Sequence, residues 1–208
     1  MREAARTVEA VVFDVGHVLY RWDLRHLYRQ LIDDPDELEW FVTHVVTPEW
    51  HFEHDAGADL AGLVAERKRR FPGHDALIDA YASRFCQSIP GPVPGTIELV
   101  ERLDEAGVAL FAITNFAHAF WLEFHPTAPV FTRFTDIVVS GTERLAKPDP
   151  AIFRLAAERF GHAPEAMLFI DDSAENVGAA AALGWQVHHF HDAAGLEADL
   201  VARGLLAR

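Results

Sequence analysis

Five short runs of apolar, mostly branched or aromatic residues are the strongest constraint on the fold of this chain. Each run is bounded by polar residues or glycine, and near-continuous hydrophobicity of this kind is typical of parallel strands covered on both faces. The runs are Val8 to Asp14, Val108 to Asn115, Asp136 to Ser140, Ala166 to Asp172 and Gln186 to Phe190. The sequence therefore predicts an α/β fold with a doubly wound parallel sheet.

Helical segments separate these runs, and the residues at their ends mark where each helix begins and stops. A serine, threonine or aspartate opens each predicted helix as an N-cap, and a glycine ends it. The start and stop residues are Thr96 with Gly107, Asp149 (before Pro150) with Gly161, and Ser173 with Gly184. This alternation of strands and helices predicts right-handed crossovers, with helices on both faces of the sheet.

The alternation is interrupted after the first run, because about ninety residues separate it from the second. A connection between a strand and a helix needs only a few residues, so this interval predicts an inserted unit. Four segments in it carry apolar residues at helical spacing: Leu24 to Leu31, Asp36 to Val46, Ala58 to Phe71 and Asp75 to Phe85. The interval closes with the Pro/Gly-rich stretch IPGPVPG, residues 89–95, which is typical of a hinge or return linker. We therefore predict a core formed by residues 1–20 and 92–208 and a helical cap formed by residues 21–91.

Charge and composition restrict the partners of the chain. Its 208 residues carry a formal net charge of −14, which repels nucleic acids and anionic membrane surfaces. Cys86 is the single cysteine, so neither an intramolecular disulfide nor a cysteine-based zinc site can form. The opening MREAARTVEA lacks a long apolar stretch, and no segment approaches the roughly 18 apolar residues of a membrane helix. We expect a cytoplasmic protein with a small-molecule partner and no nucleic-acid or membrane partner; the oligomeric state stays open.

Polar side chains stand at the carboxyl ends of the predicted strands, where open parallel sheets bind their ligands. They are Asp14, Thr114 with Asn115, and Asp171 with Asp172, while the stretch GTERLAKPDP leads from the third strand to Lys147. Adjacent carboxylates repel one another unless a hard cation such as Mg²⁺ lies between them. A lysine and a hydroxyl beside that cation suit a phosphoryl group, and one carboxylate can attack phosphorus.

Four motifs follow one another along the chain: FDVGHVL, AITNF, LAKPDPAIF and LFIDDSAEN. In this order, with a large insertion after the first, they resemble the haloacid dehalogenase-like hydrolase superfamily, in particular its phosphatases with a helical (C1) cap. The resemblance covers nearly the whole chain and implies a Rossmann-like core. It also implies that Asp14 is the nucleophile, that Thr114 and Asn115 hold the transferring phosphoryl group, and that Lys147 neutralises it.

The same resemblance implies Mg²⁺ as the cofactor. Asp172 matches the usual direct ligand, and Asp171 would be a second ligand or a water-mediated partner. Asp14 would complete the set with the backbone carbonyl of Gly16, and Asn176 would steady the site.

The first motif departs from most phosphatases of this superfamily, which carry a second aspartate two residues after the nucleophile as general acid and base. Gly16 stands there and cannot transfer a proton, and positioned acid–base catalysis is worth about 10²- to 10⁴-fold in rate. A substrate with a good leaving group, such as a sugar 1-phosphate, is one resolution, and a proton supplied by a neighbour such as His17 is another. A subgroup of capped phosphatases resembles this chain in having glycine here, usually followed by asparagine. His17 is therefore a further departure, and we expect it to contact the substrate.

The function predicted from these residues is a Mg²⁺-dependent phosphatase of a small phosphorylated metabolite, such as a sugar phosphate, acting through an aspartyl-phosphate on Asp14. Two alternatives stay open. A 2-haloacid dehalogenase also lacks the second aspartate, but it typically has an aromatic residue in place of Gly16 and lacks the pair Asp171 and Asp172. A non-catalytic protein that binds a phosphometabolite is the other alternative, and Gly16 is the residue that supports it.

Two stretches of the predicted cap need a separate interpretation. In TPEWHFEHDAG, residues 47–57, we expect a loop in which Trp50, His54 and Asp55 line the approach to the site, although core packing explains Trp50 equally well. The run ERKRR, residues 66–70, is predicted to be the solvated face of a cap helix rather than a nucleic-acid patch.

Overall fold

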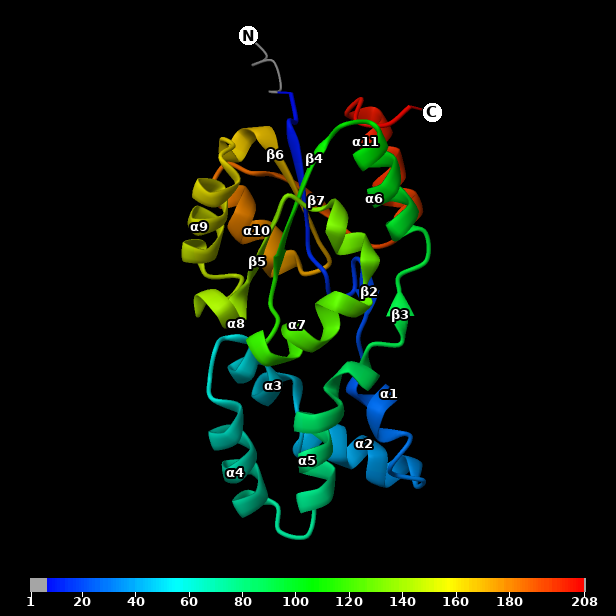
Figure 1. The fold of residues 1–208 in the computed structure, drawn as a ribbon, viewed down its shortest axis with the longest axis vertical. Coiled ribbons are helices and arrows are strands. Elements are labelled where there is room, and N and C mark those ends of the chain that lie inside the picture. The colour runs from blue at the N-terminus through cyan, green and yellow to red at the C-terminus, as the bar shows by residue number, and fades with distance from the viewer. Residues whose placement is uncertain (1–6, 208) are drawn as a thin grey trace.

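The computed structural model describes residues 7–207, and its centre is a five-stranded parallel sheet (Figure 1). The strand order is β5-β4-β1-β6-β7, and all four neighbouring pairs are parallel. The strands are β1 (Ala10–Phe13), β4 (Ala109–Thr114), β5 (Asp136–Val139), β6 (Met167–Asp171) and β7 (Gln186–His189). Each lies within one of the five apolar runs, so the predicted fold class is confirmed. Residues 1–6 of the predicted core lie outside the described residues.

Side chains of the central strand alternate between two separate hydrophobic clusters. Val11 and Phe13 belong to one cluster, and Ala10 and Val12 belong to the other. Helices α6 (Thr96–Glu105) and α11 (Ala193–Ala202) cover the first face, and α9 (Pro150–Phe160) and α10 (Ala174–Ala182) cover the second (Figure 1). Burial on both faces explains why the strand sequences are continuously apolar instead of alternating with polar residues.

The predicted helix ends are largely confirmed. Asp149 caps α9 through a hydrogen bond from Ala151 N, and Gly161 ends that helix in the left-handed conformation, with φ 72°. Ser173 likewise caps α10. The prediction for Thr96 is wrong, because Gly95 is the N-cap of α6 and Thr96 is already helical. Its hydroxyl donates to Val93 O at 2.9 Å, so it stabilises the turn before the helix.

Shorter elements connect the core strands. After β4 come α7 (His118–Phe124) and the 3₁₀ helices η2 (His125–Thr127) and η3 (Pro129–Arg133). Helix α8 (Ser140–Glu143) follows β5, and η4 (Pro164–Ala166) precedes β6. No helix within residues 7–207 has the length and apolar content needed to cross a membrane.

The interval between β1 and β4 is helical, as predicted, and its helices lie beyond the carboxyl ends of the strands (Figure 1). They are α1 (Leu24–Tyr28), α2 (Pro35–His44), α3 (Pro48–Asp55), α4 (Leu60–Arg70) and α5 (Asp75–Arg84), followed by η1 (Phe85–Ser88). The chain enters through β2 (Tyr20–Arg21) and returns through β3 (Gly91–Pro92), which pair antiparallel. The Pro/Gly-rich return segment is therefore held by a short strand pair.

One expectation for the inserted helices is wrong, and a second holds only in part. The stretch TPEWHFEHDAG contains helix α3, which Thr47 caps and Pro48 opens; a threonine before a proline is a helix start signal that the loop assignment overlooked. Trp50 packs in the core against Tyr81, with ring centroids 4.6 Å apart. In the run ERKRR, Arg67 is buried with its guanidinium 4.9 Å from the centre of the Trp50 ring, so this basic run is only partly solvated.

Candidate active site

The turn after β1 presents Asp14 at the edge of the sheet. Asp14 is buried, and its Oδ1 accepts a hydrogen bond from Val15 N at 2.7 Å. The chain then reverses: Leu19 N and Tyr20 N both donate to Val15 O at 2.9 Å, and His17 N donates to Tyr20 O at 2.8 Å. His17 adopts φ 56°, a left-handed conformation that histidine tolerates better than branched residues do. This turn fixes Asp14 and leaves the His17 side chain exposed.

A buried lysine joins two carboxylates from different strands. Lys147 is 1% exposed, and its Nζ lies 2.8 Å from Asp14 Oδ1 and 2.7 Å from Asp171 Oδ2. Asp171 is fully buried at the end of β6, the strand next to β1. A buried charge is tolerated only when it is paired and hydrogen-bonded, and this cluster meets that condition.

Asp171 is also held by the start of α10. Its Oδ1 accepts from Ser173 N at 2.8 Å, and Asn176 Nδ2 lies 3.1 Å from both carboxylate oxygens. Both oxygens of Asp171 are therefore occupied by protein donors. The backbone donors Val15 N and Ser173 N could not be predicted from the sequence, because residue type does not reveal where a main-chain N–H points.

The ionisation of this cluster reflects its burial. The pKa of Asp14 is raised to about 7, mainly by burial: the charge of Lys147 lowers it, and the charges of Asp171 and Asp172 add to the rise. Burial and the neighbouring Asp171 also raise the pKa of Asp172. For Lys147, burial lowers the pKa, but the two carboxylates more than offset it and the net shift is upward. The lysine therefore stays protonated, and the carboxylates are crowded with negative charge.

Thr114 and Asn115 end β4, on the other side of β1, and they make different contacts. Thr114 is buried, and within residues 7–207 its hydroxyl oxygen has no hydrogen-bond partner. The Asn115 side chain donates from Nδ2 to Lys147 O at 2.9 Å and accepts from Lys147 N at 2.8 Å. The carboxamide therefore fixes the backbone that carries Lys147, and the expectation that Asn115 holds a phosphoryl group stays a prediction.

Three carboxylates come close enough to share one cation. One oxygen from each of Asp14, Asp171 and Asp172 lies within 4.8 Å of the others, and Asp172 is the exposed member. Oxygen ligands of this kind suit Mg²⁺. Burial and the neighbouring carboxylates raise the pKa of Asp14 and Asp172, so a cation between them would stabilise their charged forms. The residues fit a divalent cation, with Asp14 and Asp172 better available than Asp171.

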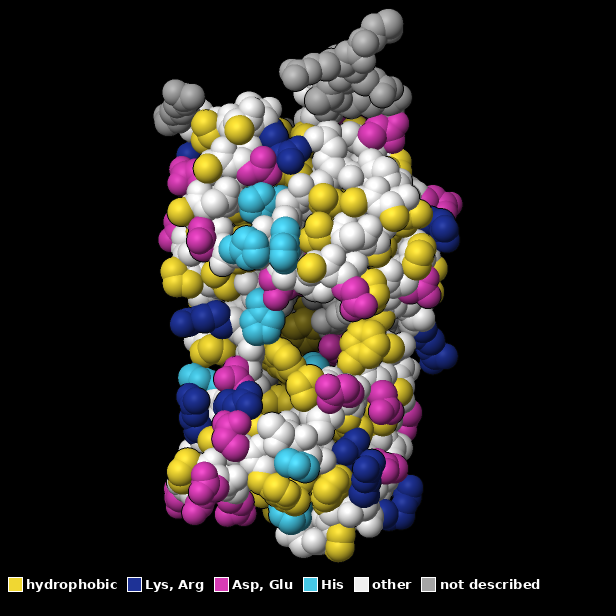
Figure 2. All heavy atoms as spheres, turned by 180° about the vertical axis from the view of Figure 1, so that it is seen from behind, with side chains coloured by type: hydrophobic (Ala, Val, Ile, Leu, Met, Phe, Trp, Pro, Cys, Tyr) yellow, Lys and Arg dark blue, Asp and Glu magenta, His cyan; other side chains and the backbone are white. Residues whose placement is uncertain are grey.

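A cavity of about 320 Å³ lies beside the turn after β1, between that turn and the first inserted helices. It is lined by His17, Trp22, Asp23, Leu24, Arg25, Val42 and Pro48. Arg25 makes two hydrogen bonds to Glu39, at 2.7 and 2.8 Å, and lies 3.5 Å from Asp23. The positive charge of Arg25 is therefore already paired with two acidic side chains. From behind, the molecule is hollowed near mid-height, with histidine and acidic side chains around the opening (Figure 2).

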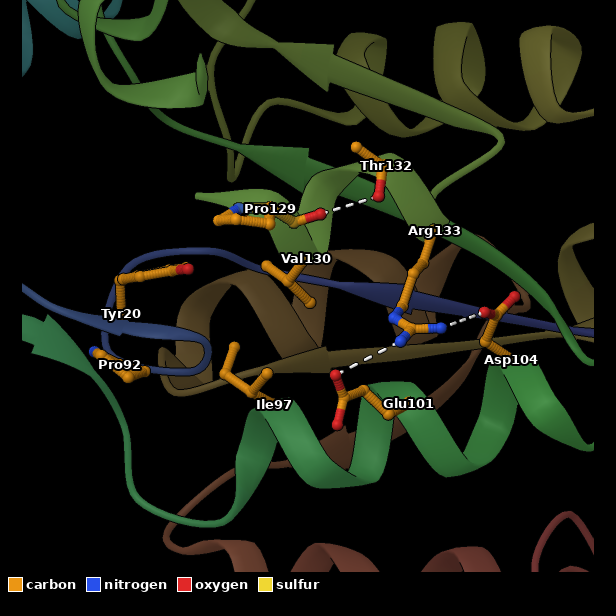
Figure 3. Close-up of a pocket in the computed structure, with 9 residues that line it drawn as sticks. All are labelled: Tyr20, Pro92, Ile97, Glu101, Asp104, Pro129, Val130, Thr132 and Arg133. Atoms are coloured by element: carbon orange, nitrogen blue, oxygen red, sulfur yellow. Dashed lines mark hydrogen bonds and ion pairs between the residues drawn. The ribbon is translucent and has the colours of Figure 1, made fainter. Parts of the chain in front are cut away.

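A second cavity has a volume of about 690 Å³, and none of the predicted site residues lines it. Figure 3 shows it between α6 and η3, with Tyr20 and Pro92 of the β2–β3 pair at one end. The guanidinium of Arg133 lies between Glu101 and Asp104, 3.3 and 2.5 Å from their carboxylates. We do not assign this cavity as the active site, although it is large, because Asp14, Lys147 and Asp171 do not line it.

Comparison with known proteins agrees with the arrangement at the sheet edge. The sequence profile of haloacid dehalogenase-like hydrolases matches residues 8–184. A phosphoglycolate phosphatase of Mesorhizobium japonicum is 29% identical over 129 residues, which are 61% of this chain and 57% of the relative. Acyl-CoA dehydrogenase family member 10 of Mus musculus is 26% identical over 86% of this chain, but the chain spans only 17% of that protein.

A solved structure shows the same fold. An enzyme of the haloacid dehalogenase family from Bacteroides thetaiotaomicron, solved as a magnesium complex, superposes with a TM-score of 0.71 at 20% identity. The match covers 90% of this chain and 95% of that enzyme. The profile match spans most of the chain, and the parallel sheet carries the expected polar residues at its carboxyl edge. The chain therefore belongs to the haloacid dehalogenase-like hydrolases.

Proposed function

We propose that this hydrolase is a Mg²⁺-dependent phosphatase of a small phosphorylated metabolite, such as a sugar phosphate, with Asp14 as its nucleophile. The observation that carries the proposal is that Asp14 and Lys147 are paired at the edge of the sheet where β4 also ends with Thr114, whose hydroxyl has no hydrogen-bond partner within residues 7–207. An ammonium and a free hydroxyl beside a nucleophilic carboxylate suit a phosphoryl group. The phosphoglycolate phosphatase relative supports the same reaction class.

The cation would be held by Asp14, Asp172 and the backbone carbonyl of Gly16. Asp171 would act through Lys147 and Asn176, because its oxygens already accept hydrogen bonds from both side chains. When bound, Mg²⁺ would offset the repulsion between the carboxylates and the phosphoryl oxygens. The Bacteroides enzyme, with the same fold, was solved as a magnesium complex.

The residues of the chain would act in two steps. The hydrogen bonds to the Asp14 carboxylate found within residues 7–207 both go to Oδ1, so we assign Oδ2 as the attacking oxygen. Oδ2 bonds to phosphorus, the ester P–O bond breaks, and the alcohol leaves with a proton from water or from His17. Water then attacks the aspartyl-phosphate, which releases inorganic phosphate and restores Asp14. Lys147 and Thr114 hold the phosphoryl oxygens in both steps.

We further propose that residues 21–91 form a helical (C1) cap over a core of residues 1–20 and 92–208. The β2–β3 pair, at the two crossings between these parts, supports this division. The 320 Å³ cavity beside His17 would hold the organic part of the substrate. Gly16, in place of the usual second aspartate, would place the chain in the capped subgroup that shares this glycine.

The experiment that tests the proposal is phosphate release from a panel of sugar phosphates and p-nitrophenyl phosphate, with Mg²⁺ or with EDTA, for the wild type and Asp14→Asn. We expect release that needs the metal and is lost in the variant. Halide release from a 2-haloacid is measured in parallel. Halide release without phosphate release would replace this proposal by the dehalogenase alternative, and no release of either would favour a binding role.

A further inference from the structure

A buried aspartate of the inserted helices contacts the loop that follows the Thr114–Asn115 pair. Asp55, the last residue of α3, is 6% exposed, and its Oδ1 accepts a hydrogen bond from Ala117 N at 2.8 Å. Its backbone oxygen accepts from Ser140 Oγ at 2.5 Å, and Ser140 Oγ in turn accepts from Phe116 N at 2.9 Å. One residue of the inserted segment thus fixes two successive amides of the loop after β4.

Asp55 is itself held rigidly from the other side. Its Oδ2 lies 3.1 Å from His51 Nε2, and His51 Nδ1 lies 2.7 Å from the Tyr81 hydroxyl, which belongs to α5. The His51 ring is stacked between Trp22 and Phe85, with centroid distances of 4.7 and 5.1 Å. The carboxylate therefore has little freedom to turn away from Ala117.

The loop is also closed in from the core side. A Cβ on Gly141 would lie 2.4 Å from His118 N and 2.8 Å from Phe116 O, so α8 packs directly on the loop backbone. The loop continues from Thr114 and from Asn115, whose side chain holds the Lys147 backbone. A displacement of Phe116 and Ala117 would therefore also displace the Thr114 hydroxyl and, through Asn115, the Lys147 ammonium.

We propose that Asp55 is a positioning residue for the phosphoryl-binding loop, residues 114–117, and so makes the geometry of the site depend on α3 being docked against the core. This inference rests on the proposed phosphatase function for its catalytic consequence. Asp55 touches neither the carboxylate cluster nor Lys147 within residues 7–207, and it acts through the backbone of Phe116 and Ala117. Small displacements of reacting groups cost large factors in rate, about 10²-fold for 1 Å.

The test compares Asp55→Ala and Asp55→Asn with two controls. Glu53→Ala removes an exposed acid from the same helix. Tyr28→Phe removes a buried hydroxyl that joins α1 to Leu77 O of α5 and contacts neither Asp55 nor His51 among the contacts found within residues 7–207. The readouts are kcat and KM for p-nitrophenyl phosphate with saturating Mg²⁺, the melting temperature, and amide hydrogen exchange of residues 114–116.

We expect Asp55→Ala to lower kcat by about 10²-fold and to speed exchange across residues 114–116. Asp55→Asn keeps an oxygen for Ala117 N and should recover most of kcat. Tyr28→Phe should lower the melting temperature but not kcat, and Glu53→Ala should change neither. If Asp55→Ala does not fold, Ser140→Ala removes the hydroxyl shared by Asp55 O and Phe116 N and gives the same test.

Two results would overturn the inference: a folded Asp55→Ala with wild-type kcat and exchange, or a Tyr28→Phe that loses as much kcat as Asp55→Ala. The second result would show that general loosening of the cap, and not the loop contact, controls the rate. If the wild type hydrolyses no ester, the proposed function fails. Hydrogen exchange of the same variants still decides whether Asp55 positions the loop.

Discussion

Lys147 Nζ lies 2.8 Å from Asp14 Oδ1, although all of the inserted helices and two core strands separate the two residues in the sequence. The ammonium also bonds to Asp171, so it cannot leave Asp14 without breaking a second buried ion pair. Asp14, the proposed nucleophile, is therefore held by the Lys147 ammonium. That ammonium is fixed in turn by Asp171 at the end of the neighbouring strand β6.

Asp14→Asn should stabilise the metal-free protein at high pH. Asp14 has a pKa of about 7 in the folded protein against 3.8 for a free side chain, so the folded state binds more protons between these values. The free energy of unfolding therefore falls as the pH rises through this interval. Asparagine does not titrate, so the melting temperature of the variant in EDTA should exceed that of the wild type at pH 8 and approach it at pH 5. An equal difference at both pH values would contradict the assignment.

Lys147→Met should abolish activity and destabilise the fold, because it leaves Asp14 and Asp171 buried without their cation. Removing one partner from a buried pair costs about 3–5 kcal/mol. The loss should be smaller at pH 5, where the pKa of Asp14 permits protonation, than at pH 8. Urea unfolding at the two pH values measures it. The double variant Asp14→Asn, Lys147→Met should recover part of the loss, and strict additivity would argue against a direct pair.

Gly16→Asp should accelerate hydrolysis of alkyl phosphates. A Cβ built on Gly16 has no heavy atom within 4 Å, and the backbone of Gly16 is not in the left-handed region, so the side chain can be accommodated. A new carboxyl group here can protonate a poor leaving group, and we expect a gain of about tenfold or more in kcat. Aryl phosphates, which need little protonation, should gain less. Equal effects on both ester types would rule out the acid role.

The enzyme should prefer esters of uncharged alcohols. The guanidinium of Arg25 in the cavity beside His17 is already paired with Glu39 and Asp23, so a carboxylate on the substrate would have to compete with these two acids for it. Comparison of 2-hydroxyethyl phosphate with 2-phosphoglycolate isolates the effect of the substrate carboxylate. We expect the neutral ester to have the higher kcat/KM by about tenfold, equivalent to about 1.4 kcal/mol. Glu39→Gln, which frees Arg25, should narrow the ratio, and a wild-type preference for phosphoglycolate would refute the prediction.

Gly141→Ala should be strongly destabilising, although alanine is normally the better helix residue. The added methyl group would lie 2.4 Å from His118 N and 2.9 Å from Ala117 Cα, and backbone cannot move aside as a flexible side chain can. Overpacking of this kind costs about 1–3 kcal/mol. Thermal unfolding measures the change, with Gly178→Ala as the control, because a Cβ there meets nothing within 4 Å.

The sequence by itself determined the sheet, most helix ends and the residues at the strand tips. Runs such as Val11 to Phe13 are apolar throughout because both sides of the strand are buried, and that requirement is visible in residue type alone. Asp149 and Ser173 cap helices through hydrogen bonds within three residues, so local sequence suffices to identify them. The polar residues at the strand tips could be placed together because parallel strands present their carboxyl ends at one edge of the sheet.

Only the tertiary structure decided which of these polar groups are free and which are occupied. Asn115 is turned to the Lys147 backbone, and both oxygens of Asp171 are taken by Lys147, Ser173 and Asn176. The Thr114 hydroxyl, by contrast, has no partner in the part of the chain that the structure describes. Asp55 was expected in a loop, and its contact with Ala117 joins segments far apart in the chain. Such contacts depend on main-chain donors and on how separate helices pack, and neither leaves a periodic signal in the sequence.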